Sequence, residues 1–206
     1  KLINLSYSLN REKLRTNRAG SYASFSIINC NTRTYHGLLV VPQPLINDDN
    51  HVLLADMDEI LVANNYEFHL GSRMYKGEIM DPKGHKYLRD YNTDINPRLI
   101  FRLGNIVLVK ELIFTFNEDR ILIKYTLEES DEKVQLRLRP FLAYRSVHNL
   151  TKANTSANTQ YKAIQNGASW QMYPGYSRVY MQLSKKAEYV HVPDWYYNVE
   201  YLREKE

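Results

Sequence analysis

The residues with the greatest chemical capacity gather in one short stretch, Asn31-Thr32-Arg33-Thr34-Tyr35-His36-Gly37. Arg33 offers a planar fork of hydrogen-bond donors, and the charge of a histidine such as His36 ordinarily changes near neutral pH. Gly37 ends the run, and the apolar residues 38–41 follow it. Because glycine allows close approach of another backbone, this pattern is typical either of a loop that fixes a strand end or of a binding site. The residues alone favour neither interpretation.

A second polar segment, residues 144–157, holds Arg145 and His148 among Asn, Thr and Ser. A histidine beside a carboxylate could run acid–base chemistry on a sugar, so His36 or His148 keeps a mutarotase-like enzyme open as an alternative. Trp195 follows Pro193-Asp194 and precedes two tyrosines. Its ring could stack on a sugar, as in an independent glucan-binding module, or anchor the chain onto a sheet, and we favour the anchor.

The acidic residues do not mark a site by themselves. Asp56 and Asp58 would share one face of a strand, but no calcium-loop spacing accompanies them, and we expect them and Glu59 on a solvated face. Cys30 is the only cysteine, which excludes an internal disulfide and suits a reducing, cytoplasmic compartment. Four histidines are scattered at no metal-ligand spacing: His51, His69, His85 and His191. We expect neither a metal site nor a cofactor.

The elements that would position these residues are strands. Tyrosine is common, at 17 of 206 residues, and tyrosine favours half-buried sheet. The segment 10–20 reads as a loop or short helix, 71–97 as irregular connections around short strands, and 198–206 as the start of a helix. Strands are predicted over residues 2–9, 21–29, 35–41, 51–63, 66–70, 98–103, 106–116, 120–127, 133–143, 168–173, 178–183 and 188–192.

The strands between residues 98 and 143 carry the clearest pattern. Short turns separate them, and Gly104-Asn105 suits a type II′ hairpin turn. In 133–143 apolar and polar residues alternate, as a half-solvated antiparallel sheet requires. We therefore predict a meander of four strands. The predicted fold is all-β, with two large packed antiparallel sheets and few short helices, because a single sheet would leave its second face wet.

Charge and hydropathy exclude two classes of partner. The net charge is +4, and residues 1–20 alone supply this excess through four more basic than acidic residues. A nucleic-acid binder would carry a basic stripe over its folded body, so we expect no nucleic-acid partner. No apolar run reaches the ~18–20 residues of a membrane span, so we expect no membrane partner. The chain begins at Lys1, which is typical of an excised piece of a longer protein.

Several segments together resemble the N-terminal domain of bacterial and archaeal glycogen debranching enzymes. The resemblance covers most of the chain in the family's order. It rests on the polar stretch described first and on four further segments: Gly20-Ser21-Tyr22-Ala23-Ser24, Leu138-Arg139-Pro140-Phe141-Leu142-Ala143-Tyr144-Arg145, His148-Asn149-Leu150-Thr151-Lys152-Ala153-Asn154, and Pro193-Asp194-Trp195-Tyr196-Tyr197-Asn198 with Glu200-Tyr201. The chain departs from the family pattern at Ser21, Cys30 and Thr34, where the family has glycine, glycine and arginine.

The resemblance implies a β-supersandwich of the galactose-mutarotase-like type, with residues 1–206 as one domain. In the family this domain precedes a helical barrel that carries amylo-α-1,6-glucosidase activity, and 4-α-glucanotransferase activity is also ascribed to the family. The chain stops at Glu206, before such a barrel, so we expect no catalytic residues here. The expected partners are the enzyme's own C-terminal barrel and an α-glucan such as glycogen or a maltooligosaccharide. The residues expected to meet them are Asn31, Arg33, Tyr35, His36, Arg145, His148 and Trp195.

Overall fold

A long central strand, β4 (Asn50–Ala63), organises the larger sheet of this computed structural model, which describes residues 4–204. The sheet has six strands in the order β1-β2-β3-β4-β12, and β5 pairs with β4 off this path. All of its pairings are antiparallel. The other five strands are β1 (Glu12–Thr16), β2 (Tyr22–Ser26), β3 (Gly37–Pro42), β5 (Tyr66–His69) and β12 (Val134–Ser146).

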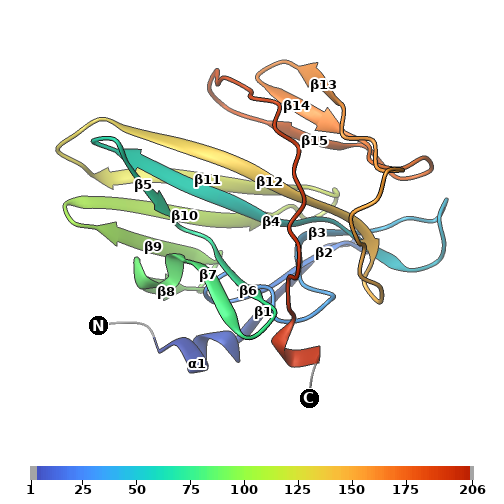
Figure 1. The fold of residues 1–206 in the computed structure, drawn as a ribbon, viewed down its shortest axis with the longest axis horizontal. Coiled ribbons are helices and arrows are strands. Elements are labelled where there is room, and N and C mark those ends of the chain that lie inside the picture. Colours follow the sequence, from blue (N-terminus) through green and yellow to red (C-terminus); the bar gives the residue numbers. More distant parts are fainter. Residues whose placement is uncertain (1–3, 205–206) are drawn as a thin grey trace.

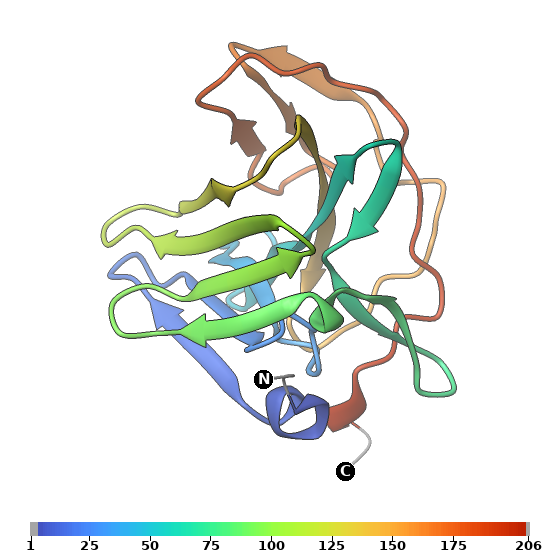
Figure 2. The same cartoon turned by 90° about the vertical axis from the view of Figure 1, so that its left-hand side faces the viewer.

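A four-stranded antiparallel sheet packs against it in the order β11-β10-β9-β8 (Figures 1 and 2). Its strands are β8 (Leu88–Asn92), β9 (Arg98–Leu103), β10 (Ile106–Phe114) and β11 (Ile121–Glu129). The core lies between the two sheets, where Met57 and Leu61 of β4 join one apolar cluster with Phe101 of β9 and Leu108 of β10. This arrangement confirms the predicted all-β antiparallel sandwich.

Smaller elements surround the sandwich. A three-stranded sheet holds β13 (Tyr161–Ile164), β14 (Gly167–Trp170) and β15 (Val179–Gln182), and a hairpin holds β6 (Ser72–Tyr75) and β7 (Ile79–Lys83). Residues 184–201, which we call the strap, run from β15 across the sheet that contains β4 and β12 (Figure 1). The helical elements are α1 (Leu5–Leu9), η1 (Gly84–Lys86) and η2 (Leu202–Glu204). None of the helices among residues 4–204 has the length and apolar character that a bilayer crossing needs.

The first twenty residues differ from the prediction. Residues 5–9, predicted as part of a strand, form α1, because the Asn4 side chain accepts a hydrogen bond from Tyr7 N at 2.9 Å and caps the helix. Residues 12–16, predicted as a loop or short helix, form the edge strand β1, whose one partner strand within residues 4–204 is β2. Edge strands are commonly charged, since charge discourages pairing with another chain, and that charge hid the strand from the sequence pattern.

Other predictions fail where they required knowing which strand lies alongside another. β12 alternates as predicted but pairs with β4 rather than continuing the meander, because periodicity reports which face is buried and not which strand lies alongside. Residues 188–192 form no strand. β13 was not predicted. The predicted turn at Gly104 is confirmed, with φ 62°, and the turn between β4 and β5 has φ 48° at Asn64 and 65° at Asn65.

Gly37 starts β3 where the chain passes β4 closely. A Cβ at this position would lie 2.8 Å from Val52 Cγ1 and 3.2 Å from Leu54 O. Any larger residue would therefore push β3 away from the central strand. The glycine that ends the polar stretch is thus explained by close approach of β4, and this close contact fixes where the loop before it emerges.

Candidate functional site

The polar loop, residues 31–37, connects β2 to β3 and lies half inside the protein. Thr32 and His36 are buried, whereas the Tyr35 side chain is 36% exposed. Asn31 Nδ2 donates to Ala55 O of β4 at 2.9 Å, which ties the start of the loop to the central strand. The loop therefore presents a few groups to solvent and uses the others to hold itself in place.

His36 is held as a neutral imidazole. Thr32 N donates to His36 Nδ1 at 3.1 Å, so the ring proton resides on Nε2, which lies 3.6 Å from Glu12 Oε1. Burial lowers the pKa of His36 to about 4, although the nearby Glu12 carboxylate opposes that shift. The ring is fully buried, so His36 neither switches charge near neutral pH nor reaches a ligand directly.

The charged groups of the loop are paired with distant parts of the chain. Arg33 Nε donates to Glu12 Oε1 of β1 at 2.7 Å. Glu204 Oε1 of η2 accepts from Thr34 N at 2.8 Å and from Thr34 Oγ1 at 3.2 Å. Arg203 completes the cluster, with its Nη1 3.7 Å from Glu12 Oε1. The loop consequently fastens the edge strand and η2 to the same point of the sandwich.

Arg145 joins the loop, as the sequence suggested, and His148 does not. Arg145 is only 5% exposed, and its Nη2 donates to Thr34 O at 2.6 Å. Its guanidinium also lies 5.6 Å from the centre of the Tyr201 ring. The His148 side chain, in contrast, is 72% exposed and lies 3.9 Å from Asp49.

The aromatic turn of the strap, residues 193–197, anchors the chain through Tyr196. Trp195 is partly buried, and its backbone N donates to Asp194 Oδ1 at 2.7 Å. The Tyr196 ring lies 4.5 Å from the Phe141 ring and 4.2 Å from the Arg73 guanidinium. Tyr196 is therefore an anchor that the sequence did not predict, and anchoring by Trp195 stays a prediction.

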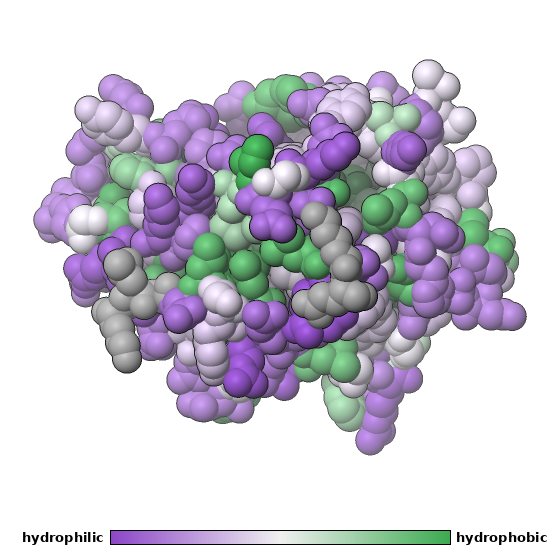
Figure 3. All heavy atoms as spheres, turned by 60° about the horizontal axis from the view of Figure 1, so that its bottom comes forward, coloured by the Kyte–Doolittle hydropathy of each residue, from purple (hydrophilic) through white to green (hydrophobic). Residues whose placement is uncertain are grey.

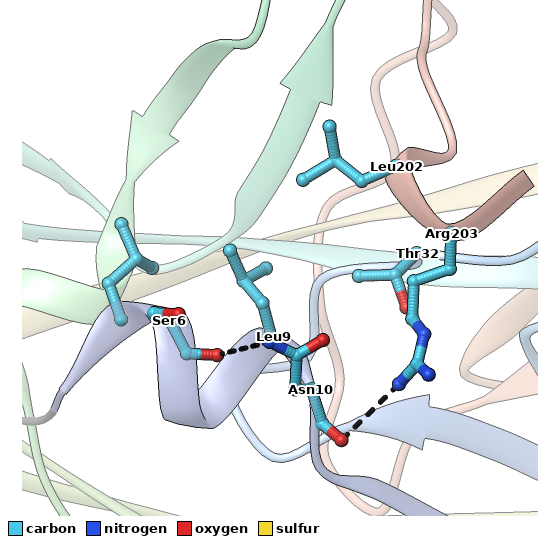
Figure 4. A pocket seen from close by; sticks show the side chains of 7 residues that line it. Ser6, Leu9, Asn10, Thr32, Leu202 and Arg203 are labelled. Carbon is cyan, nitrogen blue, oxygen red and sulfur yellow. Dashed lines mark hydrogen bonds between the residues drawn. The ribbon is translucent and has the colours of Figure 1, made fainter. Parts of the chain in front are cut away.

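A hollow of about 320 Å³ lies beside the loop (Figure 4). Leu9 of α1 and Leu202 of η2 line it together with Thr32, and Arg203 reaches across to the backbone oxygen of Asn10 at 3.4 Å. Figure 3 views the face that carries α1 and η2, and apolar atoms gather near its middle. This face combines an apolar surface with the exposed part of the polar loop.

The predicted solvated face at Asp56, Asp58 and Glu59 is wrong. Asp56 is 4% exposed and Glu59 3%. Arg73 donates to Asp58 and lies 3.7 Å from Asp56, and Asn29 Nδ2 donates to Asp56 at 2.7 Å. Burial raises the pKa of Asp56 to about 7, against the lowering influence of the cations near it.

Glu59 faces the opposite side of β4 from Asp56 and Asp58, into the space between the two large sheets. Its Oε1 lies 2.6 Å from Lys110 Nζ of β10, and both side chains are almost fully buried. The apolar run from Val52 to Ala55 could have revealed that both faces of β4 are covered, because a half-solvated strand would alternate. Among residues 4–204, no group of three or more His, Cys, Asp and Glu side chains is placed to hold a metal ion.

Comparison with known proteins adds one family. A search of curated proteins and a search of solved structures each return no match. A family model described as glycogen debranching enzyme N terminal matches residues 11–206. This range contains the polar loop, Arg145 and the strap. Since the match covers nearly the whole chain, the chain belongs to the family of glycogen debranching enzyme N-terminal domains.

Proposed function

We propose that this chain is a non-catalytic domain that packs against the helical catalytic barrel of its own glycogen debranching enzyme, of the amylo-α-1,6-glucosidase and 4-α-glucanotransferase type. The face made by the polar loop, α1 and η2 forms the contact and one wall of the α-glucan site. Within this role, Tyr35 and the exposed part of Arg33 meet the barrel or the sugar. His36 and Arg145 are buried beneath the surface of the loop and hold the loop in place.

One observation carries this proposal: the polar loop borders an apolar hollow. Thr32 belongs to both the loop and the hollow, and Leu9 and Leu202 supply the apolar surface. Protein interfaces typically combine an apolar centre with aromatic and arginine side chains. Tyr35, with the Arg33 guanidinium 5.7 Å from its ring centre, offers an aromatic and an arginine side chain in the same loop.

The mutarotase-like alternative finds less support. Such an enzyme needs a histidine and a carboxylate that reach one sugar carbon together. His36 has Glu12 beside it, but its ring is fully buried. His148 has Asp49 beside it, but both side chains are largely exposed. Neither histidine lines the hollow beside the loop.

The test substitutes Tyr35 with alanine in the full-length enzyme. Truncating an aromatic residue that is a hot spot of an interface commonly costs more than about 1 kcal/mol, so we expect debranching activity to fall at least about fivefold. The matched control is Tyr180→Ala, because Tyr180 is 64% exposed on β15 and outside the proposed contact. Full activity and an unchanged thermal unfolding curve in Tyr35→Ala would contradict the proposed contact.

A further inference from the structure

A second hollow, of about 460 Å³, lies at the end of the sandwich where several turns meet. The β4–β5 turn and the β9–β10 turn border it (Figure 1), as does the chain just after η1. Asn31 binds the backbone of Ala55, and Ala63 at this hollow follows eight residues later on β4, roughly 27 Å further along the strand. We call this hollow the end groove, and it is separate from the polar loop.

The floor of the end groove is apolar and fixed. Phe68 and Tyr87 pack edge to face with their ring centres 5.9 Å apart, and Leu103 and Ile106 are buried beneath the groove. Both bordering turns are tight, with left-handed backbone angles at Asn64, Asn65 and Gly104. Tight turns on paired strands hold their side chains at defined positions, as a preformed ligand site requires.

The rim adds an exposed ring and amide groups. The Tyr66 side chain is 70% exposed, so a ligand can cover its ring. Asn64 and Asn105 lie on the two bordering turns, and Asn105 Nδ2 is held by Asp131 at 2.8 Å. An aromatic face suits the apolar C–H surface of a sugar, and side-chain amides suit its hydroxyl groups.

The Glu132 carboxylate favours a neutral ligand over an anionic one in the end groove. Its Oε2 is buried in the wall of the groove and accepts no hydrogen bond from the described residues. That oxygen is covered, so a ligand does not touch it, but the charge of the carboxylate, which no cation among the described residues pairs with, would repel a phosphate in the groove. Arg102, also in the wall, is paired with Glu129 at 2.8 Å, which offsets its charge. The other cations in the lining are Lys86 of η1 and Arg89 of β8.

We propose that the end groove binds a short stretch of α-glucan chain, with Tyr66 stacked on a sugar ring and the side-chain amides of the rim facing its hydroxyl groups. Its volume falls within the ~300–1,000 Å³ typical of ligand pockets. The choice of an α-glucan among neutral polyols rests on the proposed function. The groove would give the enzyme a second hold on its polymer substrate, distant from the wall formed by the polar loop.

Hydrogen exchange of the full-length protein with maltoheptaose tests this site. We expect slower exchange at residues 63–68 and 102–106 on addition of the sugar. Tyr66→Ala should weaken that protection about fivefold in terms of the sugar concentration required, the usual worth of one stacked ring. Tyr180→Ala, another exposed tyrosine, should leave it unchanged. Inorganic phosphate should give no protection.

Three outcomes would overturn the proposal: no protection at these turns, protection that phosphate reproduces, or protection equally strong in Tyr66→Ala. The activity of Tyr35→Ala distinguishes a failure of the end-groove proposal from a failure of the proposed function. Loss of activity in Tyr35→Ala without sugar protection at the turns would refute the end groove and leave the barrel contact standing. Protection at the turns together with full activity in Tyr35→Ala would support the end groove and refute the barrel contact.

Discussion

The Lys110–Glu59 pair offers the sharpest test of the sandwich core. Lys110 Nζ lies 2.6 Å from Glu59 Oε1, and their side chains are 1% and 2% exposed. Tyr125 also donates to Glu59 Oε1. Lys110→Met would leave a carboxylate in the interior with only a neutral partner. Removing one member of a buried pair typically costs about 3–5 kcal/mol of the free energy of unfolding.

A double-mutant cycle isolates the interaction. Glu59→Gln keeps an oxygen for Tyr125 and strands the Lys110 ammonium, so it should cost a similar amount. The double variant Lys110→Met/Glu59→Gln carries no buried charge at this place, and it should lie within about 1–2 kcal/mol of the parent. The two single losses should therefore far exceed the loss in the double variant.

Urea unfolding followed by circular dichroism at pH 7 measures all four proteins. With a slope of about 2 kcal/mol per molar urea, a loss of about 4 kcal/mol moves the midpoint by about 2 M. Equal slopes in the four proteins serve as the control that the same surface unfolds. A loss below about 1 kcal/mol in Lys110→Met, or additive losses in the double variant, would refute the buried pair.

Two further predictions concern stability. The pKa of His36 is about 4 in the folded protein, against an ordinary value of 6.5. The stability that neutral His36 gives the folded state is therefore fully present above pH 6.5. As the pH falls towards 4, the free energy of unfolding decreases by up to roughly 3 kcal/mol. His36→Asn keeps an acceptor for Thr32 N and should lack this part of the pH dependence in urea titrations from pH 7 to 4. Asp56, whose pKa is raised, changes the free energy of unfolding in the opposite direction, but it does so equally in both proteins, so its effect cancels in the comparison. A parallel pH profile would contradict the assignment. Gly84→Ala should cost about 3 kcal/mol or more, because its Cβ would lie 2.0 Å from Leu70 O, and a urea midpoint within error of the parent would disprove that close approach.

Local signals predicted much of the sheet framework. Residues 51–63 and the hairpin around Gly104 were recognised because strand composition and turn chemistry act over a few residues. β1 was missed because Lys13 and Arg15 give an edge strand the composition of a loop. The pairing of β12 with β4 was missed because a strand's partner depends on the whole sandwich.

The polar loop shows the same division between composition and partners. Its crowding of polar groups was evident from the sequence, and Arg145 was grouped with it. Its partners were not evident, because Glu12 lies 21 residues before Arg33 and Glu204 lies 170 residues after Thr34. Only the folded chain brings these carboxylates to the loop, and they satisfy groups that otherwise would look free to bind a ligand.

The strap covers a buried cluster of charged and aromatic side chains that is separate from the apolar core between the two sheets. The Arg73 guanidinium lies 4.9 Å from the centre of the Phe141 ring and 4.2 Å from that of Tyr196, with buried carboxylates beside it. Few backbone hydrogen bonds hold the strap here, such as those that join Asn198 O to Lys76 N and Met74 O to Glu200 N. Regions held mainly by side chains open at lower free energy than ladders of paired strands. We therefore expect the strap to open at a lower free energy than the paired strands of the sandwich, as a unit of its own that can come away while the apolar core stays folded.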